Sequence, residues 1–168
     1  MAHSLPAIEA HRRFSTTATY LQSAVLLIIR LFFGYELVIT ATGHLHHVPD
    51  MVKNFTDWGV PLPKLNVYIS AYTELIGGWL LIVGLAARLI SVPLVFNFIV
   101  AYLTASKDTV HMLIFGPNHL DGVDKFFNDS AFNFLIAAMI VLAFGPGKAS
   151  IDYLLERTVF RKKRPSTA

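Results

Sequence analysis

Three ionisable side chains stand inside long apolar runs of this sequence, where a charge is costly and usually faces a partner or a cavity. Arg30 and Glu36 lie within "LLIIRLFFGYELVITATGHLHH", and Glu74 lies within "NVYISAYTELIGGWLLIVGLA". A buried carboxyl group can hold and release a proton, and an arginine can orient or stabilise an anion. These residue types therefore suggest proton exchange or ligand binding between helices, with Arg30, Glu36 and Glu74 as candidate catalytic residues.

Uncharged polar and small residues extend the predicted site. Asn97 and Asn133 occupy two further apolar runs, so each run supplies a polar side chain to one central cluster. Gly77 and Gly78 follow Glu74 and permit close helix packing. The simpler interpretation is that an Arg–Glu pair fixes helix register and that the asparagines make interhelical hydrogen bonds. For the charges, the sequence favours a ligand or proton site over that interpretation.

Histidines gather where the first and third apolar runs end. His44, His46 and His47 follow the first run, and His111 and His119 follow the third. Imidazoles from two loops can bind zinc, copper or iron, but these spacings match no specific metal motif. No metal site is predicted, and His44, His47 and His111 are retained only as weak candidates. A surface or interfacial role is the favoured interpretation.

Four apolar segments must position these groups. A bilayer core about 30 Å thick requires roughly 20 helical residues to cross it. The segments approach that length, although the last is short, and Pro93 predicts a kink in the third. The predicted fold class is all-α: a polytopic membrane protein with an antiparallel four-transmembrane-helix bundle and two long outer loops, 44–65 and 106–129. The predicted spans are Tyr20–Thr42, Asn66–Ala86, Leu89–Ala105 and Ser130–Gly145.

Composition agrees with a membrane protein and excludes several chemistries. Hydrophobic residues make up 54% of the 168 residues, with a mean hydropathy of +0.54. There is no cysteine, which rules out disulfides, thiol redox chemistry and thiolate metal or iron–sulfur sites within this chain. The excess of basic residues lies beside the apolar spans, so it indicates membrane orientation and not nucleic-acid binding.

The distribution of Lys and Arg predicts the topology. Four spans place both termini on one side, and most basic residues share that side, whereas the opposite loops hold only Lys53, Lys64, Lys107 and Lys125. The positive-inside rule makes both termini cytoplasmic. The predicted organisation is a cytoplasmic tail at 1–18, a membrane domain at 19–155 and a basic cytoplasmic tail at 156–168. Tyr20 onward is expected to be a retained span and not a cleaved signal.

Several ordered stretches resemble one family. "IIRLFFGYELVITATGHL", "AYTELIGGWLLIVGLAARLISVPL" and "FGPGKASIDYLL" are similar to the first span, the second span with its hairpin, and the closing element of the DoxX-like membrane proteins. The resemblance covers about 24–155. By this resemblance, the residues that match the family's motif positions are Arg30, Glu74, Gly77, Gly78, Arg88 and Asp152. The family usually has a lysine near the end of the first span, where this chain has "GHLHH".

The resemblance implies a four-helix protein of the bacterial or archaeal cytoplasmic (inner) membrane, in a family whose members are described as oxidoreductase or quinone-linked subunits. The favoured hypothesis is a redox-associated subunit that uses quinone as cofactor, bound by Arg30, Glu74, Gly77, Gly78, Asn97 and Asn133. Its expected partners are the lipid bilayer, other membrane or periplasmic subunits or a second copy of itself, and no nucleic acid. One alternative is a non-catalytic accessory subunit, and a proton-coupled small transporter is less favoured because no repeat is evident.

Overall fold

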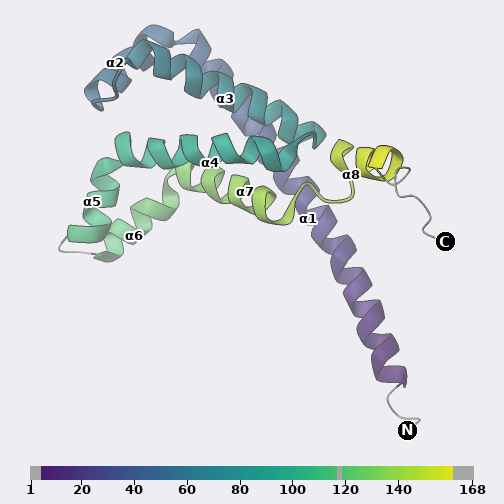
Figure 1. Ribbon diagram of the computed structural model, residues 1–168. Helices are drawn as coiled ribbons and strands as arrows, with labels where there is room; N and C mark the ends of the chain where they lie inside the picture. The colour runs from purple at the N-terminus through teal and green to yellow at the C-terminus, as the bar shows by residue number, and fades with distance from the viewer. Residues whose placement is uncertain (1–4, 117–118, 161–168) are drawn as a thin grey trace.

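The computed structural model describes residues 5–116 and 119–160, and all regular structure within them is helical. This confirms the predicted all-α class. Helix α1 runs the length of the molecule, short helices lie at one end, and α8 lies at the other (Figure 1). The helices are α1 (Leu5–His46), α2 (Val48–Asp57), α3 (Pro63–Val83), α4 (Ala87–Thr104), α5 (Lys107–Phe115), α6 (His119–Asn128), α7 (Ser130–Phe144) and α8 (Ile151–Leu155), followed by the π-helical turn η1 (Glu156–Phe160).

Three helices of the described chain are long and apolar enough to cross a membrane: α1, α3 and α4. The fourth predicted span corresponds to α7 and is short, as expected, but the bend before it was not predicted. Helix α7 has 15 residues, about 22 Å of helix, which is shorter than the apolar core of a bilayer. Helices α6 and α7 pass the same test only as a pair, and they meet at a bend of 66°. Asp129 sits at this bend, where its carboxylate accepts the Ala131 N–H and caps α7.

The spans pack as two pairs joined by a hairpin. Helix α1 packs chiefly along α3, and α4 packs chiefly along α7. The predicted tight turn between α3 and α4 is present: Gly84 ends α3 with φ +67°, and Ala86 precedes α4 with φ +48°. Leu37, Leu81 and Leu94 belong to the buried cluster that holds the two pairs together.

Glycines set the distance between α1 and α3. A Cβ added to Gly78 would lie 2.6 Å from the Gly34 carbonyl oxygen, and one added to Gly34 would lie 2.9 Å from the Gly78 oxygen. The two backbones are therefore in direct contact, as small residues allow between membrane helices. Gly77 faces the other way, where an added Cβ would meet the Leu94 side chain of α4 at 2.9 Å.

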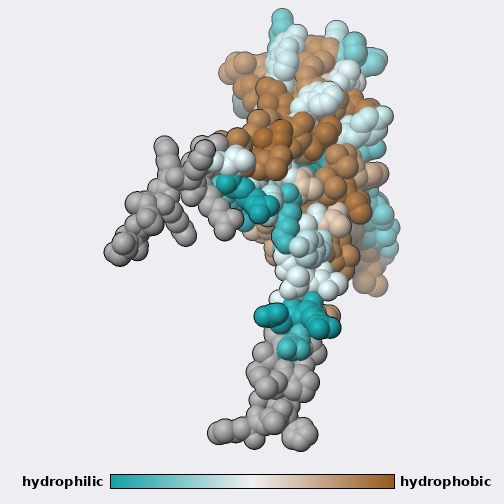
Figure 2. Space-filling view, turned by 90° about the vertical axis from the view of Figure 1, so that its right-hand side faces the viewer, coloured by the Kyte–Doolittle hydropathy of each residue, from teal (hydrophilic) through white to brown (hydrophobic). Residues whose placement is uncertain are grey.

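Helix α1 crosses the boundary predicted between a tail and the membrane domain. Its 42 residues extend about 63 Å, roughly twice the thickness of a bilayer core. The N-terminal half projects from the packed body (Figure 1). Figure 2 shows hydrophilic residues on this projection and mostly hydrophobic surface on the body above it. The regions predicted as outer loops are also largely helical, as α2, α5 and α6.

Candidate functional site: a carboxyl group beside an apolar cavity

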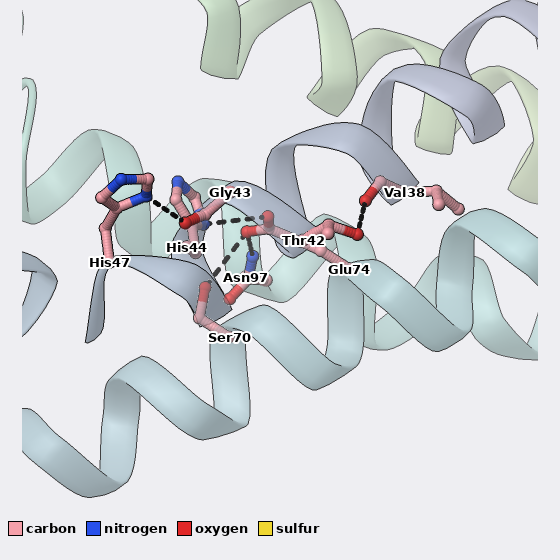
Figure 3. Close-up of polar contacts among 8 residues, drawn as sticks. All are labelled: Val38, Thr42, Gly43, His44, His47, Ser70, Glu74 and Asn97. Carbon is pink, nitrogen blue, oxygen red and sulfur yellow. Dashed lines mark hydrogen bonds and ion pairs between the residues drawn. The ribbon is translucent and has the colours of Figure 1, made fainter.

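The candidate site is built around Glu74, which is 5% exposed in the middle of α3. Its Oε1 accepts hydrogen bonds from the Asn97 side-chain amide at 2.9 Å and from the Ser70 hydroxyl at 3.1 Å. Its Oε2 lies 3.6 Å from Nδ1 of His44. Figure 3 shows these three side chains converging on the carboxyl group. Both carboxyl oxygens therefore face polar groups from the protein.

Three helices supply this cluster, and each placement follows from local sequence. Ser70 is one turn before Glu74, so both lie on one face of α3. The tight α3–α4 turn returns the chain antiparallel and brings Asn97 of α4 beside Glu74. His44 lies in the last turn of α1, which runs along α3. The half-exposed His44 thus connects the buried carboxyl group with the end of the molecule where α2 lies.

A cavity of about 480 Å³ adjoins Glu74, His44 and Asn97. Aromatic side chains form much of its wall: Phe55 from α2, Trp58 directly after it, Phe96 from α4 and Phe134 from α7. It extends to the region where Ser106 precedes α5 and Asp129 precedes α7, and those two side chains are hydrogen-bonded to each other. Such an apolar chamber with a few convergent polar groups has the usual composition of a small-molecule site.

Arg30 lies in a second polar cluster, away from the cavity. Its guanidinium is 1% exposed, donates a hydrogen bond of 2.6 Å to the Ala149 carbonyl, and is attracted by Asp152. A Cβ on Gly84 would lie 1.8 Å from one guanidinium nitrogen, so Arg30 packs against the α3–α4 turn. Gly84 is ten residues after Glu74, about 15 Å along α3. The single central cluster expected from the sequence is therefore divided into two sites.

The cluster around Arg30 ties the closing segment of the chain to the hairpin. The Asp152 carboxylate accepts the backbone N–H groups of Ala86 at 2.7 Å and Ala87 at 2.9 Å, the first donors of α4. The Asp152 N–H in turn donates to the Gly84 carbonyl at 3.0 Å. We call this arrangement of Arg30, Gly84 and Asp152 the hairpin lock. Its geometry serves packing and helix capping.

Four other predicted site residues also lie outside the cavity lining. Glu36 is half-buried on α1, and Asn133 is exposed on α7. Gly77 and Gly78 make the helix contacts described above. Of the predicted catalytic and cofactor-binding residues, Glu74 and Asn97 meet in the cavity wall. The others lie on α1, α3 or α7 and face different neighbours.

The histidines retained as weak metal candidates are separated by their contacts. His44 faces Glu74, Nδ1 of His47 lies 3.0 Å from the Gly43 carbonyl oxygen, and the His111 ring packs against Phe115 with centroids 5.3 Å apart. Within residues 5–116 and 119–160, no three His, Asp or Glu side chains are grouped to hold a metal ion. The side chain of His119, together with all of His3, lies outside the part of the chain that can be described.

The contribution of His44 to the Glu74 cluster was not predicted from the sequence. The available signal was the spacing of Thr40 and His44, which are four residues apart on α1 and both line the cavity. The sequence interpretation gave His44 a surface or interfacial role instead. The contribution of α2 to the cavity wall was also missed, although Val48, Met51, Val52 and Phe55 have the spacing of an amphipathic helix, because the segment was interpreted as a loop.

Helices long and apolar enough to cross a membrane indicate a multi-pass helical membrane protein, and a buried carboxyl cluster in it adjoins a cavity. Residues 25–107 match the protein-family model described as DoxX. The chain therefore belongs to the DoxX family, and the matched segment runs from α1 through α4 and contains the whole Glu74 cluster. No curated protein and no solved structure matches the chain significantly.

Proposed function

We propose that this DoxX-family protein binds a quinone in the cavity beside Glu74 and acts as a redox-associated subunit of a membrane complex. The observation that carries the proposal is the placement of Glu74 and His44, 3.6 Å apart, in the wall of an apolar chamber of about 480 Å³. A quinone ring is flat and apolar and carries two carbonyl oxygens. It matches walls formed by Phe96, Trp58 and Phe134 with hydrogen-bonding groups set among them.

The polar groups suit the ends of such a ring. The Asn97 amide and the His44 imidazole can donate hydrogen bonds to a quinone carbonyl, and Glu74 can accept a proton or give one up. Conversion of a quinone to a quinol requires two electrons and two protons. With a quinone bound, Glu74 and His44 could supply the one proton that the carbonyl oxygen beside them takes up, the second proton would reach the other oxygen from elsewhere, and the half-exposed imidazole would exchange protons onward with water.

Electrons must reach the site from another molecule. The chain has no cysteine and hence no thiol or iron–sulfur centre of its own. We therefore assign the electron donor to a partner protein, and the chain acts as the quinone-binding subunit. The bacterial or archaeal cytoplasmic membrane is the proposed location. Arg88 and Lys148 line one hollow together with Asp152 of α8, and Arg157 lies in η1, directly after α8, which favours that end as cytoplasmic.

A second candidate is a non-catalytic accessory subunit, and one specific observation favours it. Arg30, Gly77, Gly78 and Asp152, which the family resemblance carries over, serve helix packing and the hairpin lock and do not line the cavity. A protein selected for assembly alone would retain those contacts. It would not need a ligand beside Glu74.

The test is the quinone content of gently purified protein, measured per mole by extraction and chromatography. The variant Glu74→Gln keeps the size of the side chain and removes its ionisation. The matched control is Glu36→Gln, which makes the same change on a half-buried carboxyl group outside the cavity. We expect stoichiometric quinone in the wild type and the control, and its loss in Glu74→Gln.

Unfolding of each protein in mixed micelles separates loss of a ligand from loss of fold. Equal quinone content in all three proteins would remove Glu74 from the proposal. Absence of quinone from all three, with equal stability and no binding of added quinone, would refute the proposed function and favour the accessory subunit.

A further inference from the structure

A second hollow lies on the outside of the α3–α4 hairpin and adjoins the Glu74 cavity. It is a groove of about 410 Å³. Three of its lining residues, Ile69, Thr73 and Pro93, also line the cavity. The same side chains therefore have the cavity on one side and the groove on the other. They form a thin wall between α3 and α4.

The groove is apolar and follows the direction of α3. Tyr68, Tyr72 and Ile76 are spaced by four residues, so they lie on one face along about 12 Å of helix. The Tyr68 and Tyr72 rings stack with centroids 6.3 Å apart, and Ile90 of α4 lies opposite. Ile76 is 53% exposed. Because α3 and α4 are membrane spans by length and composition, this face meets lipid chains.

The helices leave room at this wall. Figure 1 shows α3 and α4 meeting at their shared turn and diverging toward the end where α2 and α5 lie. Pro93 stands inside α4 and has no N–H, so the helix lacks one backbone bond there. Of the three shared side chains, Thr73 and Pro93 are small. An opening here requires movement of short side chains and no unfolding of a helix.

We propose that the ligand of the Glu74 cavity enters sideways from the bilayer between α3 and α4, and that its long apolar chain then lies in the groove. This inference rests on the proposed function and narrows the ligand class to membrane quinones that carry an isoprenoid chain. The headgroup reaches Glu74 past Ile69, Thr73 and Pro93. The chain extends over Tyr72 and Ile76 into lipid. A chamber of this size holds a ring, and the adjoining groove supplies the path for a chain that the chamber cannot enclose.

Photolabelling of the full chain in lipid nanodiscs tests the position of the chain. The probe is a benzoquinone with an alkyl chain that carries a diazirine at mid-chain, and the competitor is the same benzoquinone without a chain. We expect labels on the peptide containing Tyr72 and Ile76, and we expect excess competitor to remove them. Competition by a chainless headgroup links the label in the groove to occupancy of the cavity.

The variant Ile76→Trp fills the groove and leaves the cavity lining unchanged, because Ile76 is not part of it. The matched control, Ile28→Trp, places the same ring at an exposed position of α1 outside both hollows. We expect Ile76→Trp to lose groove labelling while it still binds the chainless quinone. Ile28→Trp should retain both.

Four results would overturn the inference. Labels concentrated on Phe55 and Trp58 would mean that the chain leaves toward α2 and the outer end. Labels in the groove that the competitor leaves unchanged would mean that an independent lipid chain or a second copy of the protein occupies it. If the wild type binds the chainless quinone but the groove is not labelled, the lateral path is wrong and the proposed function stands. If the wild type does not bind the chainless quinone, the proposed function is wrong as well.

Discussion

Replacing Gly84 by alanine tests whether the hairpin lock holds the fold together. Gly84 ends α3 with φ +67°, a conformation that costs an L-residue about 1–2 kcal/mol. The new Cβ would also lie 1.8 Å from a nitrogen of Arg30 and 2.7 Å from Cβ of Ser150. One small adjustment cannot relieve both clashes of the new Cβ, because Arg30 is 1% exposed and fills the space beside the turn.

The magnitude follows from what Arg30 must give up. Moving its guanidinium breaks the 2.6 Å hydrogen bond to the Ala149 carbonyl and draws the charge away from Asp152. A hydrogen bond to a charged group is worth about 1.5–3 kcal/mol. Together with the backbone term, Gly84→Ala should lower the free energy of unfolding by roughly 3–5 kcal/mol. Alanine also lowers the conformational entropy of the unfolded chain relative to glycine, and this small stabilising effect does not alter the range.

Gly59→Ala is the matched control. Gly59 also has a positive φ, +79°, but nothing lies within 4 Å of an added Cβ. It should cost only the backbone term, about 1–2 kcal/mol. The measurement is unfolding in mixed micelles with increasing denaturing detergent, followed by helical circular dichroism. If Gly84→Ala proves no more costly than Gly59→Ala, then Arg30 does not pack against the turn and the hairpin lock is wrong.

Two further predictions concern the helix contacts and use the same unfolding titration. Gly78→Ala should destabilise the protein by about 1–3 kcal/mol, because its Cβ would press on the Gly34 carbonyl and separate α1 from α3. Gly43→Ala is the control and should not destabilise the protein, because nothing lies within 4 Å of the added Cβ. Equal losses of stability in the two variants would count against the contact between Gly34 and Gly78. Asp152→Ala should cost at least about 1–2 kcal/mol, because α4 loses its cap and Arg30 also loses the carboxylate that attracts it. A neutral result for Asp152→Ala would show that the closing segment does not secure the hairpin.

The separation of the two polar clusters changes the role of the buried charges. Arg30 and Glu74 are both costly to bury and have different local partners, and among the described residues Nε and Nη1 of Arg30 have no hydrogen-bond partner. Arg30 is held by a carbonyl and attracted by a carboxylate near the hairpin turn. Glu74 is held by an amide, a hydroxyl and an imidazole beside the cavity. The arginine thus belongs to assembly of the fold, and the glutamate is the group available to a ligand.

The sequence by itself determined the helices and part of the site. Long apolar runs identify membrane spans because hydropathy is a property of the local segment and lipid leaves the backbone few alternatives to a helix. The pairing of Glu74 with Asn97 was also within reach, since a tight turn at Gly84 brings two neighbouring spans together at matching depth. The length of α1 and the bend before α7 could not be predicted from the sequence, because Thr, Ser and Asp residues continue or break a helix according to their surroundings.

Only the tertiary structure decided which buried charge meets which partner. The hydrogen bond of Arg30 to Ala149 joins residues 119 positions apart, and it exists because the segment after α7 folds back onto the α3–α4 turn. Neither that return nor the packing of His44 against Glu74 follows from spacing along one helix. Helical periodicity fixes which residues share a face, whereas the neighbour that each face meets depends on how the whole chain packs. That packing gave Glu74 a cavity and gave Arg30 a structural role.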